Sequence, residues 1–133
     1  MPLSYINPEA VVKPVNYTHV VQATGSRIIS VAGQTGQDKN GNLVGEGDLA
    51  AQTDQTMKNL EACLASVGAT FADVIKMTTF VVDYEAGRDR AVLIAVRNKY
   101  LPPDNPPSST LVGVQALGSP GIMVEIEVTA VLP

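Results

Sequence analysis

The sequence contains one cysteine, one histidine, no tryptophan and no long hydrophobic run. The single Cys63 excludes a disulfide within the chain, and one histidine with one cysteine cannot supply a nitrogen and sulfur cage for a structural metal. No stretch approaches the roughly 20 apolar residues that cross a bilayer. The first residues have neither the basic start nor the apolar core of a secretory signal. We therefore expect a cytoplasmic protein with no metal, no cofactor and no membrane partner.

Positive charge is also scarce. Nine Lys and Arg residues stand against 13 Asp and Glu residues, which gives a formal net charge of -4, and the nine are scattered along the chain. Phosphate backbones are bound by clustered Lys and Arg, and single strands by rows of aromatic side chains. Neither pattern is present, so we expect no nucleic-acid partner.

The remaining composition is that of a globular protein. Of the 133 residues, 45% are hydrophobic and 17% are charged. A chain of this length can bury about two-thirds of its unfolded surface, which is enough for one core. We find no repeat, low-complexity tract or linker, and we expect residues 1–133 to form a single domain.

Two segments have the apolar spacing of helices. From Leu49 to Val67 apolar and Thr side chains recur every three or four residues, with Asp48 as N-cap and Gly68 after the C-terminus. The members of this stripe are Leu49, Thr53, Met57, Leu60, Leu64 and Val67. A second helix is expected from Arg88 to Tyr100, where Val92, Val96 and Tyr100 face the core and a proline-rich segment follows.

The β-rich runs surround these helices. Residues 17–23 and 27–32 flank Gly25 and Ser26 and predict a hairpin. Further strands are expected at residues 74–82, 109–114 and 122–131. The order β-β-α-β-α-β-β predicts an α/β sandwich, in which two helices cover one face of a mixed sheet.

The strand at residues 74–82 carries large apolar side chains on both alternating positions. Such strands are expected where both faces of a sheet are buried. Two helices can cover only one face, so another copy of the chain is the simplest cover for the second. We therefore expect a homo-oligomer.

The last strand carries the first candidate for chemistry. Alternation places Glu125 and Glu127 on one face and three valine or isoleucine side chains on the other. These carboxylates are either a solvated face or groups beside an interface, where one can be paired or tuned for proton transfer. His19 is either a proton shuttle or a hydrogen-bonded structural side chain. Gly33, which has no side chain, would let a ligand approach the backbone closely.

Taken together, several segments resemble the Rid family, the reactive-intermediate deaminases also called YjgF-like proteins. The segments follow one another from about residue 17 to residue 131 and cover nearly the whole chain. They are residues 17–19, 31–34, 52–60, 69–78, 107–110 and 124–127.

The resemblance implies a chorismate-mutase-like fold, with a mixed sheet backed by two helices on one face. It also implies a homotrimer with small-molecule clefts between subunits. Its deaminating members hydrolyse small imine or enamine acids such as 2-aminoacrylate. We therefore expect a Rid-like hydrolase, and a non-catalytic trimer that binds a small metabolite is the alternative. An endoribonuclease activity attached to some relatives is disfavoured by the acidic charge.

Site residues follow from the same resemblance. Glu125 matches the catalytic glutamate, Tyr17 the cleft tyrosine, Gly33 the cleft glycine, and Thr110 the residue two past an arginine that grips the substrate carboxylate. That arginine is replaced by Ser108.

Two further positions depart from the family pattern, with Ala32 in place of a serine and Ile94 in place of an asparagine. The nearest source of a replacement charge is Arg97, one turn after Ile94, although a solvated surface charge is the ordinary expectation for a helical arginine. We expect a substrate other than 2-aminoacrylate, with Ser108, Thr110 and Arg97 as candidate ligand-binding residues.

Overall fold

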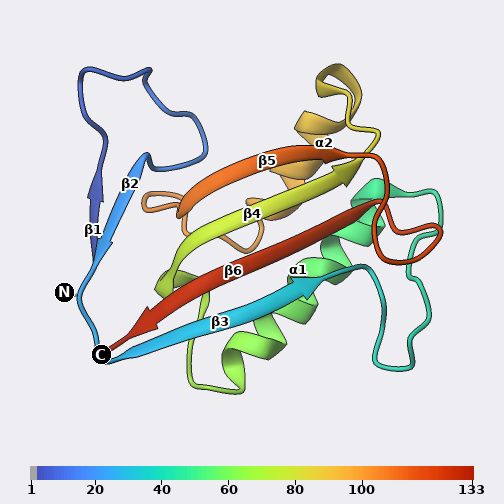
Figure 1. Cartoon of the computed structure of the whole chain (residues 1–133), viewed down its shortest axis with the longest axis horizontal. Helices are drawn as coiled ribbons and strands as arrows, with labels where there is room; N and C mark the ends of the chain where they lie inside the picture. The colour runs from blue at the N-terminus through green and yellow to red at the C-terminus, as the bar shows by residue number, and fades with distance from the viewer. Residues whose placement is uncertain (1–2) are drawn as a thin grey trace.

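The computed structural model describes residues 3–133 and contains a four-stranded sheet in the order β3-β6-β4-β5 (Figure 1). Its strands are β3 (Arg27–Gln34), β4 (Val74–Val82), β5 (Ser108–Val114) and β6 (Val124–Leu132). β6 pairs antiparallel with both β3 and β4, whereas β4 and β5 are parallel. The expected mixed sheet is confirmed, and β3 and β5 form its two edges.

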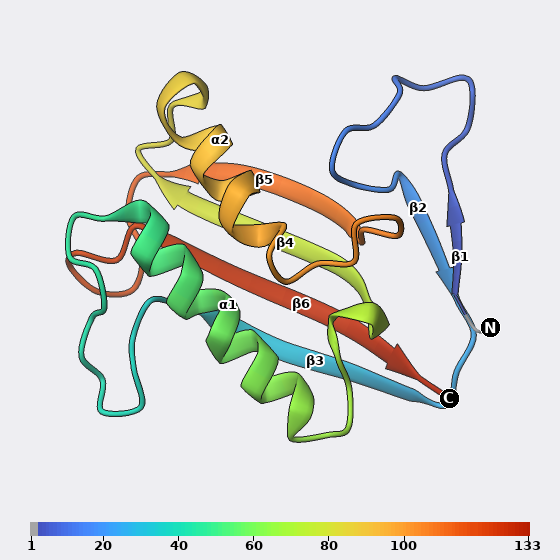
Figure 2. The ribbon, with the colours of Figure 1, turned by 180° about the vertical axis from the view of Figure 1, so that it is seen from behind.

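Two helices cover one face of this sheet, as the element order predicted (Figure 2). They are α1 (Leu49–Ala65) and α2 (Ala86–Arg97). Asp48 caps α1 by accepting a hydrogen bond from the Ala51 amide at 3.1 Å. Gly68 has a φ of 78°, which is the left-handed conformation expected after a helix.

The second helix begins two residues earlier than expected and ends three residues earlier, at Arg97. Val96 is buried, and Val92 and Tyr100 pack against the core, as predicted. The expected apolar stripe of the first helix is wrong at Val67, which is 39% exposed because α1 has already ended at Ala65.

The core lies between the helices and the sheet. Its largest fully buried apolar side chains include Met57, Leu60, Leu64, Met77 and Ile126. Each such side chain contributes about 1.5–3 kcal/mol by leaving water. The β4 strand has a bulge at its start, because the pairing with β6 shifts between Val74 and Lys76. Val74 and Met77 are therefore both buried under the helices, and a strict alternation beginning at Val74 does not hold.

One polar side chain in this core connects three segments. Gln52 is fully buried on α1 and donates from Nε2 to the carbonyl oxygens of Gly45 at 3.1 Å and Gly121 at 3.0 Å. Its Oε1 accepts from the Met123 amide at 2.9 Å. Gln52 thereby fixes the entry into β6, the strand that carries Glu125.

The N-terminal residues form a second, smaller sheet that stands beside the first (Figure 1). It consists of β1 (Leu3–Ile6) and β2 (Val20–Ala23), paired antiparallel. Residues 3–23 are called the arm below.

The predicted hairpin between residues 17–23 and 27–32 is wrong, because β2 pairs with β1 and β3 pairs with β6. The reason lies at the turn. The Ser26 amide donates to the Leu132 carbonyl at 3.1 Å, and Gly25 lies against the backbone of the same residue. The chain therefore passes over the end of β6 instead of folding back on itself.

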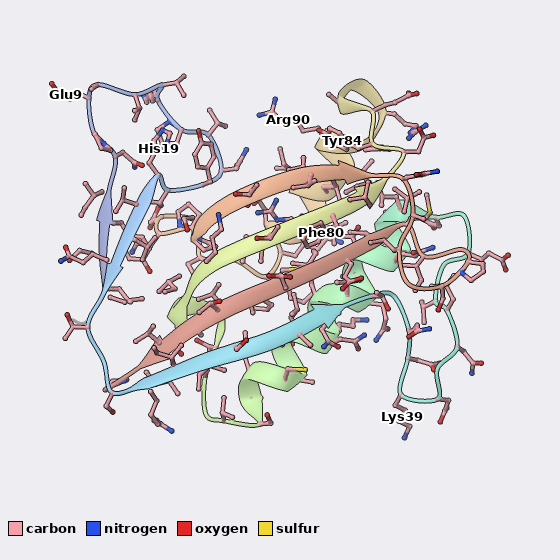
Figure 3. All side chains as sticks on the ribbon, in the orientation of Figure 1. Glu9, His19, Lys39, Phe80, Tyr84 and Arg90 are labelled. Atoms are coloured by element: carbon pink, nitrogen blue, oxygen red, sulfur yellow. The ribbon has the colours of Figure 1, made fainter. Side chains whose placement is uncertain are left out.

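The sheet face opposite the helices carries Lys76, Thr78, Phe80, Glu125 and Glu127, and it is called the helix-free face below. Figure 3 looks onto this face, with Phe80 labelled. The side chain of Phe80 is half-buried and lies on the face of the sheet away from both helices. Among residues 3–133, no helix has the length and apolar character needed to span a membrane.

Candidate functional site

Glu125 and Gly33 lie together on the β3–β6 side of the sheet. Glu125 is half-buried and stands opposite Phe80 in the pairing of β6 with β4. A Cβ atom at Gly33 would come within 2.7 Å of the Glu125 Cδ atom, so a side chain there would overlap the carboxylate. The sequence predicted that Gly33 leaves room for a ligand, and in this chain the Glu125 side chain fills that room.

Ser108 and Thr110 occupy the helix-free face at the other edge of the sheet. Ser108 Oγ donates to the Ile75 carbonyl at 2.9 Å. Lys76 Nζ donates to Thr110 Oγ1 at 2.7 Å, so an ammonium group lies beside this candidate residue. Sequence analysis did not select Lys76, because only the pairing of β4 with β5 shows that it lies beside Ser108 and Thr110.

A cavity of about 220 Å³ lies at the β5 edge, on the helix side of the sheet. It is formed by α2, β5 and residues 15–17 of the arm. The lining residues that matter below are Tyr17, Leu93, Ile94, Arg97, Ser109 and Leu111. We call it the Arg97 cavity.

Arg97 is the charged group of this cavity. Its side chain ends α2 and is only 8% exposed, so the expectation of a solvated surface charge is wrong. Arg97 Nη2 donates to Ser109 Oγ at 3.1 Å, and the buried Nε has no hydrogen-bond partner among residues 3–133. Burial lowers the pKa of the guanidinium, since desolvation disfavours the charged form. No carboxylate of residues 3–133 lies within ion-pair distance of it.

Tyr17 is held at the cavity by its neighbour in the chain. Thr18 is buried, and it donates from its amide to the Pro107 carbonyl at 3.2 Å and from Oγ1 to the Pro106 carbonyl at 2.6 Å. The proline-rich segment before β5 therefore anchors the arm, and Tyr17 comes to lie beside α2.

His19 has the structural role that was one of its two interpretations. Its Nε2 lies 2.6 Å from the Val12 carbonyl oxygen, and its backbone amide donates to Asn7 Oδ1 at 2.8 Å. Its ring also makes an edge contact with the Tyr17 ring, with centroids 5.1 Å apart. Figure 3 shows His19 within the arm, where it holds the loop between β1 and β2.

Within one chain the predicted site residues thus form three groups. Tyr17 joins Arg97, Gly33 joins Glu125, and Ser108 joins Thr110. Sequence reasoning missed Ser109, which faces the helices and contacts Arg97, because it placed the motif on the neighbouring residues. The alternation of β5 was the available signal, since Ser109 shares its face with Leu111. The described residues hold no group of three or more His, Cys, Asp and Glu side chains suited to a metal ion.

Comparison with known proteins identifies the family. The family model described as Endoribonuclease L-PSP matches residues 8–132. The chain belongs to this family. It is also called the Rid or YjgF family in the names of the solved structures that resemble this chain.

Two solved structures of the family and one curated relative are similar to this chain over most of their length. YyfB of Yersinia pestis has a crystal structure with a TM-score of 0.89 at 36% identity, covering 99% of this chain and 100% of that one. The structure of Rv2704 from Mycobacterium tuberculosis has a TM-score of 0.64 at 33% identity, covering 89% and 88%. Protein DfrA of Myxococcus xanthus is 33% identical over 115 residues, which are 86% of this chain and 84% of DfrA. The expected resemblance to the Rid family and its fold is confirmed.

Proposed function

We propose that this Rid-family protein is a hydrolase that deaminates a small imine or enamine acid in a cleft between the subunits of a homotrimer. The observation that carries the proposal is the Glu125 carboxylate on the helix-free face, which fits there only because residue 33 is glycine. A half-buried carboxylate at an otherwise uncovered face is well placed to transfer protons.

The reaction needs one water and a proton relay. Water adds to the imine carbon, and Glu125 takes the proton that this water loses and passes it to the imine nitrogen, which leaves Glu125 ionised again. The resulting tetrahedral amino alcohol then loses its C–N bond. The hydroxyl proton passes through Glu125 to the departing nitrogen, a C=O bond forms, and the products are a 2-oxo acid and ammonia. No redox partner or metal is required by this balance.

The positions of the site groups support a cleft shared between copies. Glu125 lies on β6 next to the β3 edge, whereas the Arg97 cavity opens at the β5 edge. These edges are on opposite sides of one sheet, so a single chain does not bring the two groups together. A closed ring of copies would do so if the β5 edge of one copy, with its helix-side cavity, faced the helix-free face of the next copy near its β3 edge.

The substrate is proposed to differ from 2-aminoacrylate. Ser108 stands at the position of the family's carboxylate-binding arginine, and its hydroxyl donates a hydrogen bond to the Ile75 carbonyl. A charge for a substrate carboxylate must therefore come from another element of the fold.

RNA cleavage, which the family description names, has less support. The net charge is -4. The only histidine, His19, is engaged with the Val12 carbonyl in the arm. A ribonuclease of this size would need a basic surface for the phosphate backbone, and the basic residues are scattered.

The experiment compares Glu125→Gln with Glu127→Gln. Both side chains lie on the helix-free face of β6, and each swap keeps the shape and removes the charge. We expect Glu125→Gln to lose imine turnover and keep the trimer mass in sedimentation equilibrium. Glu127 is exposed and has no ion pair within residues 3–133, so we expect its partner on a neighbouring copy and a loss of assembly or thermal stability in Glu127→Gln.

The reverse pattern contradicts the assignment of Glu125. A monomer mass for the wild-type protein at micromolar concentration contradicts the trimer. Saturable binding of small acids by the wild type, without turnover of any imine, would identify a non-catalytic binding protein instead.

A further inference from the structure

Arg97 has more hydrogen-bond donors than the chain satisfies. A guanidinium group carries five N–H donors. Within the described part of the chain, the Arg97 side chain makes one hydrogen bond, to Ser109 Oγ, and its buried Nε has no partner. Arg97 is 8% exposed, and no carboxylate of residues 3–133 lies within ion-pair distance of it. Its charge is therefore desolvated, which costs free energy unless an anion pairs with it. The unpaired guanidinium therefore favours the binding of an anion in the cavity.

Polar groups around Arg97 suit a carboxylate. Ser109 Oγ accepts the Arg97 hydrogen bond, so its own hydroxyl proton is free to be donated to a second acceptor. The planar guanidinium matches the two oxygens of a carboxylate in a bidentate pair. Arg90 also lines the cavity and is exposed, so it adds a second positive charge that attracts anions to the cavity mouth. Figure 3 labels Arg90 at the outer side of β5.

The remaining wall is apolar. Leu93, Ile94 and Leu111 line the cavity beside Arg97, and Leu93 is fully buried whereas Leu111 is 36% exposed. A volume of about 220 Å³ has room for roughly seven water-sized groups, at about 30 Å³ each. That is more space than a three-carbon acid fills. Because burying apolar surface is favourable, the apolar walls should bind a ligand with a hydrocarbon side chain more tightly.

We infer that the Arg97 cavity binds the carboxylate of a small 2-oxo or 2-imino acid with an aliphatic side chain, with Arg97 pairing with the carboxylate and Leu93, Ile94 and Leu111 contacting the side chain. This inference rests on the proposed function and names the group that holds its substrate. Arg97 comes from α2, whereas the position that the sequence comparison assigned to this task is Ser108 on β5.

Isothermal titration calorimetry with four probes tests the inference. The probes are 4-methyl-2-oxopentanoate, pyruvate, the uncharged methyl ester of the first acid, and inorganic phosphate. We expect the branched acid to bind at least tenfold more tightly than pyruvate, and the ester and phosphate to bind far more weakly. Tighter binding of phosphate than of either acid would overturn the assignment of the ligand class.

The matched variants are Arg97→Met, which keeps the length of the side chain without its charge, and Arg27→Met on β3, away from the cavity. Arg97→Met should weaken binding of the branched acid by roughly 10- to 150-fold, the range for a lost charged hydrogen bond. Arg27→Met should bind like the wild type. Undiminished binding by a folded Arg97→Met protein would overturn the inference.

Thermal unfolding without ligand separates a binding role from a structural one. If the Arg97 guanidinium is unpaired in the ligand-free protein, its replacement by Met removes a buried unpaired charge, and the Tm should stay the same or rise. A marked fall in Tm would show that Arg97 is paired within the assembly and would contradict the inference. Acid binding without imine turnover would leave the inference standing and reject the proposed function, whereas turnover unaffected by Arg97→Met would do the opposite.

Discussion

Gly33 on β3 and the Glu125 carboxylate on β6 share one space, since a Cβ atom at Gly33 would come within 2.7 Å of Glu125 Cδ. The glycine is required here by close approach and not by its backbone conformation, because its φ is outside the left-handed region. The flexible end of a glutamate side chain is the part that would move. The position of the proposed proton relay therefore depends on the absence of one methyl group.

Gly33→Ala should displace the Glu125 carboxylate and reduce imine turnover at least tenfold, with a stability loss below about 1 kcal/mol because a flexible side chain gives way. Gly25→Ala provides a contrast, since its Cβ would come within 2.6 Å of Val131 Cγ1 and 3.1 Å of the Leu132 backbone carbon. That variant should lose about 1–3 kcal/mol in urea unfolding.

Gly87→Ala on α2 is the control for both, because nothing lies within 4 Å of its Cβ position. It should be neutral or stabilise the helix by up to about 1 kcal/mol. Normal turnover in Gly33→Ala would show that the Glu125 position is not critical.

Gln52→Leu should destabilise the protein by about 3 kcal/mol, because it leaves the Gly45 and Gly121 carbonyls and the Met123 amide without their buried partner. Gln55→Leu on the same helix is the control. Within residues 3–133 its side chain donates to Asn59 four residues later and to no other group, and such a pair contributes about 0.2–0.5 kcal/mol. Urea unfolding of both variants measures the difference, and equal losses would mean that the Gln52 hydrogen bonds do not fix the entry into β6.

Tyr100 predicts a loss of stability in alkali. Burial and its hydrogen bond to Asp54, at 2.7 Å, raise the pKa of Tyr100 to about 12 from its usual value near 10. A group whose pKa is raised in the folded state contributes stability that is fully present below the unfolded pKa and is lost as pH rises toward the folded one. The free energy of unfolding should therefore fall between about pH 10 and pH 12 through this group.

The measurement compares wild type with Tyr100→Phe, which does not titrate. The difference in unfolding free energy between the two should shrink across that interval, since other tyrosines and lysines affect both proteins equally. A difference that is constant from pH 9 to pH 12 would mean that the Tyr100 hydroxyl titrates alike in the folded and unfolded chain.

Local patterns predicted most of the fold. Three features depend on neighbouring residues and agree with the structure: the α1 stripe as far as Leu64 with its Asp48 cap, the alternation that places Glu125 on the other face from Val124 and Ile126, and the position of β4. The pairing of β2 was mispredicted because pairing depends on a distant segment. Nothing near Gly25 indicates that Leu132 will accept the Ser26 amide, more than 100 residues away.

The candidate site was predictable in its residue types but not in its grouping. Glu125 and Gly33 came from strand alternation and the family resemblance, and they do lie together. The burial of Arg97 was missed, because an arginine at a helix end is usually solvated. Its position depends on the arm, where Thr18 bonds to the carbonyls of Pro106 and Pro107 and closes the cavity over α2.

The rate of ammonia release shows whether Glu125 relays protons in imine hydrolysis. The imine of leucine, generated by an amino-acid oxidase, is followed in the presence of wild-type protein and of Glu125→Gln, with the uncatalysed hydrolysis as baseline. We expect the wild type to accelerate hydrolysis, and the rate to fall by roughly 100-fold or more toward the baseline for a trimeric Glu125→Gln protein. A wild-type rate equal to the baseline, or an equally fast Glu125→Gln protein, would contradict this expectation.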